Sequence, residues 1–213
     1  MLHLYLFPSF LQGVVLSVDT FYSHVAREAI SAGVSMVNDV SGGLLDTEML
    51  RTVADFAGVS YVVMHMRGDP TTMQDRINTT YTDLVPDIAR ALGERCSAAV
   101  EAGIEPWRLV LDPGIGFAKT PVDNLKLIAG LERFRAHLPA GCLQRAPILV
   151  GPSRKGFLGR LTGRADPKDR DWATAGAAVA CVERGADIIR VHNVKGVRDA
   201  VRVADSVRRG RWR

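Results

Sequence analysis

Six short apolar runs, rich in β-branched residues, recur along the chain. Each run is continuous rather than alternating with polar residues, which is typical of strands covered on both faces in a parallel sheet. Glycines precede three of the runs, at positions where a left-handed residue commonly ends a helix: Gly33, Gly103 and Gly185. The runs themselves span Val14–Val18, Val34–Val37, Tyr61–Met64, Leu109–Leu111, Ile148–Val150 and Ile188–Val191.

Amphipathic stretches separate these runs and predict a helix after each strand. Strands that alternate with helices and are joined by right-handed crossovers form either a doubly wound sheet or a (βα)₈ barrel. The chain is therefore predicted to be an α/β protein. The expected helices span Ser23–Ala32, Asp46–Phe56, Tyr81–Ala102, Pro121–His137, Asp171–Arg184 and Val197–Val207.

Polar residues stand at the carboxyl end of every run, and they favour the barrel. A (βα)₈ barrel gathers its active site from the ends of many strands, whereas a doubly wound sheet binds its ligand at one switch point. Gly114-Ile115-Gly116 lacks the third glycine of a dinucleotide fingerprint, and Gly151–Gly156 lacks the Lys-Ser/Thr ending of a P-loop. The strand-end residues are Asp19, Asn38, His65, Asp112, Ser153-Arg154-Lys155, and Arg190 with His192.

The number of units predicts an incomplete barrel. A complete TIM-type barrel has eight βα units in roughly 250 residues, whereas six units are expected in these 213 residues. We expect an apolar segment at 1–13, a partial TIM (βα)₈-type barrel with six of its eight units at 14–208, and a basic tail at 209–213.

Composition narrows the classes of function. The net charge of +4 is mild, and no interleaving of aromatic and basic residues indicates a nucleic-acid surface. The segment 1–13 is too short to span a bilayer and lacks the basic start of a signal peptide. Cys96, Cys142 and Cys181 are scattered, which suggests neither a disulfide framework nor a zinc site. We expect no nucleic-acid partner, no membrane partner and no metal ligands among the side chains.

Three of the strand-end side chains are candidate hydrogen-bond acceptors. Asp19 and Asn38 have an alternative role, because side chains of these types commonly cap the following helix. Asp112 is the stronger candidate, since it precedes a Pro-Gly-Ile-Gly-Phe segment whose glycines let bare backbone approach a ligand. A single histidine such as His65 is more often a satisfied core residue than a ligand.

Cationic side chains gather after the last two runs. Arg154 and Lys155 are adjacent, and Arg190 and His192 lie two residues apart, hence on one face of a strand. An arginine in a buried strand requires an anionic partner. These four residues indicate a phosphate or pyrophosphate pocket, and a structural network of salt bridges is the alternative.

In this order the strand-end motifs resemble the dihydropteroate synthase family, over Leu16 to about Asp205. They are most similar to the plant-type enzyme, which is fused behind hydroxymethyldihydropterin pyrophosphokinase. The motifs are Ser17-Val18-Asp19-Thr20, Asn38-Asp39-Val40, Met64-His65-Met66-Arg67-Gly68, Asp112-Pro113-Gly114-Ile115-Gly116-Phe117, Ser153-Arg154-Lys155 and Arg190-Val191-His192-Asn193.

The resemblance implies the condensation of 6-hydroxymethyl-7,8-dihydropterin pyrophosphate with 4-aminobenzoate to give 7,8-dihydropteroate and pyrophosphate. Asp19, Asn38 and Asp112 would hold the pterin ring, because its amino-pyrimidinone edge presents adjacent N–H donors. Met64 and Phe117 would line its pocket.

The same resemblance assigns Lys155, Arg190 and His192 to catalysis, with Ser153 and Arg154 in the substrate-binding set. Lys155 would lie by the ring and the 4-aminobenzoate. Arg190 and His192 would stabilise the pyrophosphate leaving group, helped by Mg²⁺ bound to the pyrophosphate. A homodimer and a mitochondrial location are also implied, with a cytoplasmic location as the alternative.

Two departures from the family pattern temper this expectation. Gly156 stands where the family often has serine, which bears on the 4-aminobenzoate pocket. The family's first two βα units have no counterpart in residues 1–13, so we expect weak or no synthase activity from this chain alone. The alternatives are a non-catalytic pterin-binding remnant or partner subunit, and a methyltetrahydrofolate-binding methyltransferase domain.

Overall fold

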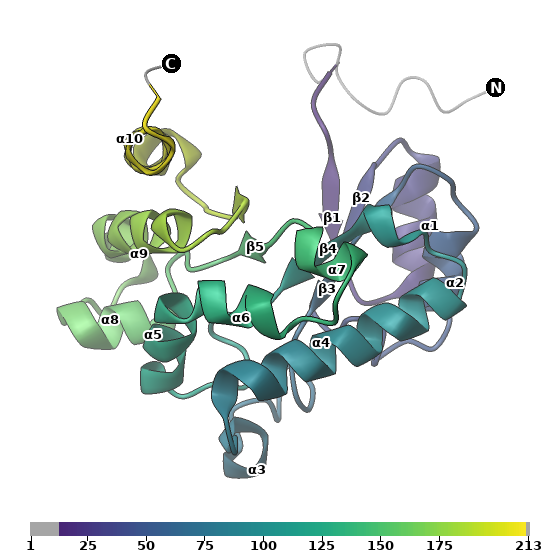
Figure 1. Cartoon of the computed structure of the whole chain (residues 1–213), viewed down its shortest axis with the longest axis horizontal. Helices are drawn as coiled ribbons and strands as arrows, with labels where there is room; N and C mark the ends of the chain where they lie inside the picture. Colours follow the sequence, from purple (N-terminus) through teal and green to yellow (C-terminus); the bar gives the residue numbers. More distant parts are fainter. Residues whose placement is uncertain (1–12, 212–213) are drawn as a thin grey trace.

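The computed structural model describes residues 13–211 of the chain. The expected apolar segment at 1–13 lies outside the described residues except for Gly13, as do the last two residues of the expected basic tail. Parallel strands alternate with helices that pack around them (Figure 1), which confirms the α/β class. Among the described helices, none is both long enough and apolar enough to cross a membrane.

The strands pair in chain order, and every pair is parallel. A four-stranded sheet and a two-stranded sheet are joined by a bridge between Leu111 and Ile148. All six strands therefore follow one another in a single row, as six consecutive units of an incomplete barrel would. The strands are β1 Ser17–Asp19, β2 Met36–Asp39, β3 Ser60–Met64, β4 Leu109–Asp112, β5 Leu149–Val150 and β6 Ile188–Ile189.

The main helices cover the strands along their length. They are α1 Ser23–Ser31, α2 Met49–Ala54, α4 Leu84–Glu101, α5 Pro121–Ala129, α6 Leu131–His137, α9 Asp171–Glu183 and α10 Val194–Arg209. Short elements that the sequence pattern did not predict lie between them: α3 Arg76–Thr79, α7 Cys142–Arg145, α8 Gly156–Thr162, and the 3₁₀ turns Pro106–Arg108 and Pro167–Arg170.

Two expected elements differ from the structure. The first strand begins at Ser17 rather than Val14, and the Val14 and Val15 side chains are 55% and 68% exposed. The expectation of burial was wrong there because β1 is the edge of the sheet within the described residues. The helix expected over 121–137 is two helices, α5 and α6, which meet at Gly130, a residue that weakens a helix interior.

Successive strand residues divide between two environments. Alternate side chains point to opposite faces, and one face packs against the helices in a large core that includes Val37, Val63, Ile88, Leu92 and Leu111. The other face forms a smaller apolar layer inside the row of strands. That layer consists of Val62, Val110 and Leu149, with Met36 and Ile188 packed against them.

Buried Arg108 fastens β4 to the preceding unit. Its guanidinium donates to the backbone carbonyls of Val53, Phe56 and Val59 at 2.9, 2.9 and 2.6 Å, and it pairs with Glu105. A buried cation is tolerated here because each of its three nitrogens donates to an oxygen. The contact sets where β4 begins, and hence where its last residue, Asp112, lies.

Replacing this cation tests its structural role. Arg108→Ala is expected to lower the free energy of unfolding by about 3 kcal/mol, because three backbone carbonyls lose their donor. Urea denaturation measures the change. Arg90→Ala removes only an exposed pair with Asp87 and should cost less than about 0.5 kcal/mol. Equal losses in the two variants would contradict the assigned role.

Candidate active site

The polar side chains form a layer directly above the interior apolar layer. Because side chains alternate along a strand, each residue two positions after an apolar-layer residue points the same way. Met36, Val62, Val110 and Ile188 belong to or pack against that layer, and two positions further along stand Asn38, Met64, Asp112 and Arg190. Parallel pairing places Asp19 opposite Asn38 and Met64 opposite Asp112. The expected gathering of strand ends is therefore present.

The first part of the layer presents hydrogen-bond acceptors. The Asn38 Nδ2 atom donates to Asp19 Oδ1 at 2.9 Å, and the buried Asn38 Oδ1 atom has no partner among the described residues. Asp112 is buried, and its Oδ1 atom accepts the Gly114 N–H at 2.7 Å. A buried acceptor without a partner is costly, so this part of the layer suits a ligand that carries N–H donors.

Asp39 lies next to Asn38 but on the opposite face of β2. Its carboxylate accepts bonds from the Ser41 backbone N–H and hydroxyl, the Gly43 N–H and the Tyr61 hydroxyl, all at 2.7 or 2.8 Å. Asp39 is therefore a structural acceptor beneath the loop after β2, and Asn38 is the member of this pair that faces the site.

Burial perturbs the ionisation of three charged groups in the layer. It raises the pKa of the Asp112 carboxyl to about 6, although the Gly114 N–H and then the Lys155, Lys119 and Arg190 cations act in the opposite direction. Burial also lowers the pKa of Lys155 to about 8 and that of Lys119 to about 7, with Asp112 opposing both shifts. Ionisable groups whose pKa values are shifted toward neutral pH in this way are typical of functional sites.

Lys119 is a residue of the site that the sequence analysis missed. It is buried, and its Nζ atom donates to the Phe117 carbonyl at 2.8 Å and lies 3.2 Å from His65 Nδ1. Burial, reinforced by the Lys119 charge, holds the pKa of His65 well below its usual value, so the neutral ring can accept from Lys119. His65 thus lies in the core beneath the loop after β4, but its buried Nε2 atom has no hydrogen-bond partner among the described residues, so it is not the fully satisfied core histidine that was expected.

Phe117 and Lys155 come together from different loops. The Lys155 Nζ atom lies 3.9 Å from the centroid of the Phe117 ring, within the range of a cation–π contact. The approach requires Gly116, because a Cβ atom there would lie 2.6 Å from Lys155 Cδ. An apolar ring and an amine with a lowered pKa therefore face the site beside Asp112.

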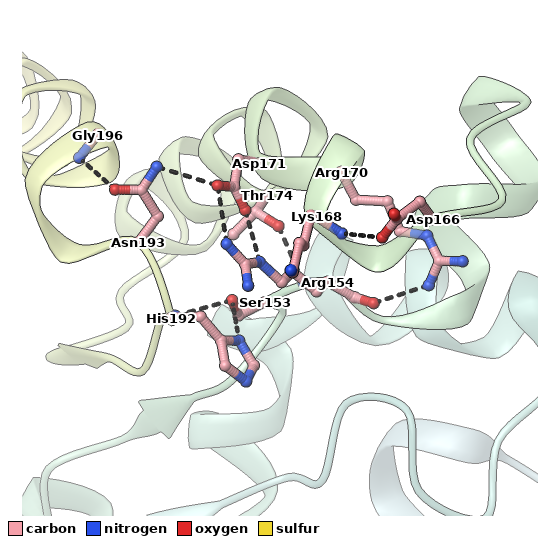
Figure 2. A network of polar contacts seen from close by, with 10 residues as sticks. All are labelled: Ser153, Arg154, Asp166, Lys168, Arg170, Asp171, Thr174, His192, Asn193 and Gly196. Atoms are coloured by element: carbon pink, nitrogen blue, oxygen red, sulfur yellow. Dashed lines mark hydrogen bonds and ion pairs between the residues drawn. The ribbon is translucent and has the colours of Figure 1, made fainter.

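The cationic part of the layer lies at the end of the row of strands. Arg190 forms an ion pair with Asp19, so the last strand reaches the first. The Arg190 side chain is 46% exposed, and the expectation that it lies in a buried strand was wrong, since β6 ends at Ile189. Ser153 Oγ lies 2.7 Å from His192 Nδ1 and accepts the His192 backbone N–H at 3.0 Å (Figure 2).

Arg154 is the predicted site residue that the structure does not bring to the others. Its guanidinium is turned to Asp171 at the start of α9, with an Nε–Oδ1 distance of 2.8 Å (Figure 2). The Arg154 backbone has φ of +58°, in the left-handed region, which directs Arg154 and Lys155 to different sides of the loop. In this arrangement Lys155 faces Phe117, and Arg154 links the loop after β5 to the start of α9.

Comparisons with known proteins agree with this geometry. Residues 4–192 match the family described as pterin binding enzyme. The chain is 47% identical over 198 residues to the mitochondrial folate synthesis bifunctional protein of Pisum sativum, covering 92% of this chain and 38% of that protein. The chain thus spans about two fifths of the length of the plant bifunctional relatives it matches.

Two solved structures show the same arrangement. The dihydropteroate synthase of Stenotrophomonas maltophilia, with imidazole bound in its active site, is similar with a TM-score of 0.82 and 40% identity over 91% of this chain and 69% of that one. The Xanthomonas albilineans dihydropteroate synthase in complex with 7,8-dihydropteroate has a TM-score of 0.78 and 40% identity, covering 91% of this chain and 68% of that chain.

The turn after β4 offers a test of the geometry. Gly114 has φ of +75°, and a Cβ atom there would lie 2.0 Å from the His65 carbonyl oxygen. Gly114→Ala should therefore displace the loop and lower the free energy of unfolding by about 2 to 4 kcal/mol, measured by urea denaturation.

A glycine in open space is the control for that variant. Nothing lies within 4 Å of a Cβ atom at Gly176 in α9, so Gly176→Ala should be neutral or stabilise by up to about 1 kcal/mol. A Gly114→Ala protein as stable as the Gly176→Ala protein would refute the close approach.

Proposed function

The chain belongs to the pterin-binding enzyme family, and from that premise we propose that its polar layer is a dihydropteroate synthase site. The reaction is the condensation of 6-hydroxymethyl-7,8-dihydropterin pyrophosphate with 4-aminobenzoate. The observation that carries the proposal is the pairing of two neighbouring parts: the buried acceptors Asn38 and Asp112 on one side, and the cationic group around Arg190 and His192 on the other.

The acceptor part suits the pterin ring. An ionised Asp112 accepts two adjacent N–H donors of an amino-pyrimidinone edge, and the unpartnered Asn38 Oδ1 atom accepts a third. Met64 forms part of the floor, since it is buried on the same face as Val62. Phe117 provides an apolar surface beside the ring, and Lys155 lies over Phe117 where the second substrate would approach.

The cationic part suits the leaving group. In the reaction a C–N bond forms between the aromatic amine and the pterin methylene carbon as the C–O bond to pyrophosphate breaks. Negative charge then grows on the departing oxygen, and Arg190 and His192 are placed to stabilise it. The Ser153 hydroxyl contacts the His192 ring and holds it in place. The proton that leaves the amine passes to solvent or to the departing pyrophosphate.

Magnesium enters this proposal only with the substrate. The described residues contain no group of three His, Cys, Asp or Glu side chains placed to hold a metal ion. A magnesium ion commonly keeps most of its waters and binds through phosphate oxygens with one or two carboxylates. We therefore place the ion on the pyrophosphate of the substrate, and we assign no step of the reaction to it.

A location and an assembly complete the proposal. The folate synthesis bifunctional proteins of Pisum sativum and, in one case, Arabidopsis thaliana are named as mitochondrial, which supports a mitochondrial location. Trp172 on α9 and Val203 and Val207 on α10 are exposed apolar residues, and we propose a homodimer that covers some of them. Small molecules, rather than nucleic acid or membrane, are the partners of the site itself.

The ionisation of Asp112 gives a pH-dependent test. Only the ionised carboxylate accepts paired N–H donors, and its pKa lies at about 6. The affinity for 6-hydroxymethylpterin should therefore fall by about tenfold per pH unit below pH 6, whereas an ordinary aspartate would allow full affinity down to about pH 4. Fluorescence titration between pH 4.5 and 8 measures this.

Two variants accompany that titration. Asp112→Asn should weaken binding and abolish its pH dependence over this range. Asp199→Asn changes an exposed carboxylate on α10 and should leave both the affinity and the pH profile unchanged. A binding midpoint near pH 4 in the unmodified protein, or an unchanged profile in Asp112→Asn, would refute the role of Asp112.

Turnover is tested with both substrates and radiolabelled 4-aminobenzoate. The proposed reaction releases one pyrophosphate per labelled product, and Lys155→Ala and Arg190→Ala should each lower the rate by at least about a hundredfold. Substantial turnover would contradict the expectation of a weak synthase while supporting the reaction. Pterin binding without any labelled product would instead favour a non-catalytic pterin-binding protein.

A further inference from the structure

We propose that Asp171, the first residue of α9, is a positioning residue that holds together the two loops that carry the anion-binding side chains. This inference rests on the proposed function and adds to it a residue outside the site. Asp171 lies between the loop after β5 and the loop after β6, and it contacts both (Figure 2).

The contacts of Asp171 form a three-point tie. Arg154 donates from Nε to Asp171 Oδ1 at 2.8 Å and from Nη2 to Oδ2 at 3.0 Å, which is the bidentate geometry of a strong arginine–carboxylate pair. Asn193 Nδ2 donates to the same Oδ2 atom at 3.0 Å. A single carboxylate therefore fixes a side chain from each loop.

The two residues that bond to Asp171 are direct sequence neighbours of the side chains proposed to bind the substrates. Arg154 stands between Ser153 and Lys155, and Asn193 follows His192. The two loops are linked a second time by the contacts between Ser153 and His192. Losing the Asp171 tie would leave the candidate ligands themselves as the main link between the loops, in competition with any anion they bind.

The tie also orients the helix that follows β6. The Asn193 Oδ1 atom accepts the Gly196 N–H at 2.9 Å and so caps α10, while its Nδ2 atom is held by Asp171. Because the two ends of one amide group are engaged at once, the start of α10 and the start of α9 share one rigid contact. Because His192 directly precedes Asn193, this contact also sets the backbone direction at His192.

Backbone strain at Arg154 supports a positioning role. A non-glycine residue at φ of +58° persists only where its surroundings hold it. Thr174 Oγ1 accepts the Arg154 N–H at 3.0 Å, and Arg170 Nη1 donates to the Arg154 carbonyl at 2.9 Å. The Arg154 pair also holds the pKa of Asp171 below its usual value, so the tie is ionised at neutral pH.

The first experiment needs no ligand. Asp171→Asn keeps the side-chain shape but removes the charge and one acceptor, and amide hydrogen exchange then reports on the loops. We expect the His192 and Gly196 amides to exchange at least about tenfold faster. The matched control is Asp169→Asn, two residues earlier, whose carboxylate makes no hydrogen bond or ion pair within residues 13–211. Unchanged exchange in Asp171→Asn would overturn the proposal.

The second experiment separates positioning from general stability. Calorimetric titration with inorganic pyrophosphate should show roughly tenfold weaker binding in Asp171→Asn, while 6-hydroxymethylpterin affinity stays within about twofold, because the acceptors on β2 and β4 are not tied to Asp171. Arg154→Gln breaks the same pair from the other loop and should give the same pattern. Equal losses for both ligands, or no loss for either, would overturn the inference.

The outcomes also distinguish this inference from the proposed function. If the unmodified protein binds neither pyrophosphate nor pterin, the proposed function fails, and the exchange measurement alone decides whether Asp171 holds the loops. If the unmodified protein binds both ligands and Asp171→Asn behaves like Asp169→Asn, the proposed function stands and the positioning role fails.

Discussion

Parallel pairing of short strands is the constraint on which the site depends. It places every carboxyl end at one edge, and its register sets Asp19 opposite Asn38 and Met64 opposite Asp112. A slip of one residue in β2 would turn Asn38 toward the helices and bring Asp39 into the site. That slip would leave the Tyr61 hydroxyl without its acceptor. The buried hydrogen bonds of Asp39 therefore stabilise the register that keeps Asn38 in the polar layer.

The order and class of the elements could be predicted from the sequence, because continuous apolar runs with polar ends are typical of parallel strands covered by helices. The exact bounds could not. The burial of Val14 and Val15 depends on whether another strand lies beside β1, which the local pattern does not encode. Helix α8 escaped prediction because Gly156 and Gly159 weaken its helical signal, although α8 packs against α9 and the nearby 3₁₀ turn.

The candidate site was predictable where position along a strand determines direction, as for Asn38, Asp112 and Arg190. It was not predictable where direction depends on contacts between distant segments. In the sequence alone, Lys119 resembles an ordinary polar loop residue. Only the fold brings it next to His65, which is more than fifty residues earlier in the chain. Arg154 and Lys155 are adjacent cations in the sequence, and only the left-handed backbone and Asp171 send them to different partners.

The ion pair between Asp19 and Arg190 joins the first and last described strands, and it also joins the two halves of the proposed site. Each partner is a candidate ligand for a different part of the substrate, and neither is free while the pair is intact. A pterin that engages Asp19 would release Arg190, and an oxyanion that engages Arg190 would release Asp19. If each ligand breaks the pair, the pair has to be broken only once, and by thermodynamic reciprocity the two ligands would then favour each other's binding to the same extent.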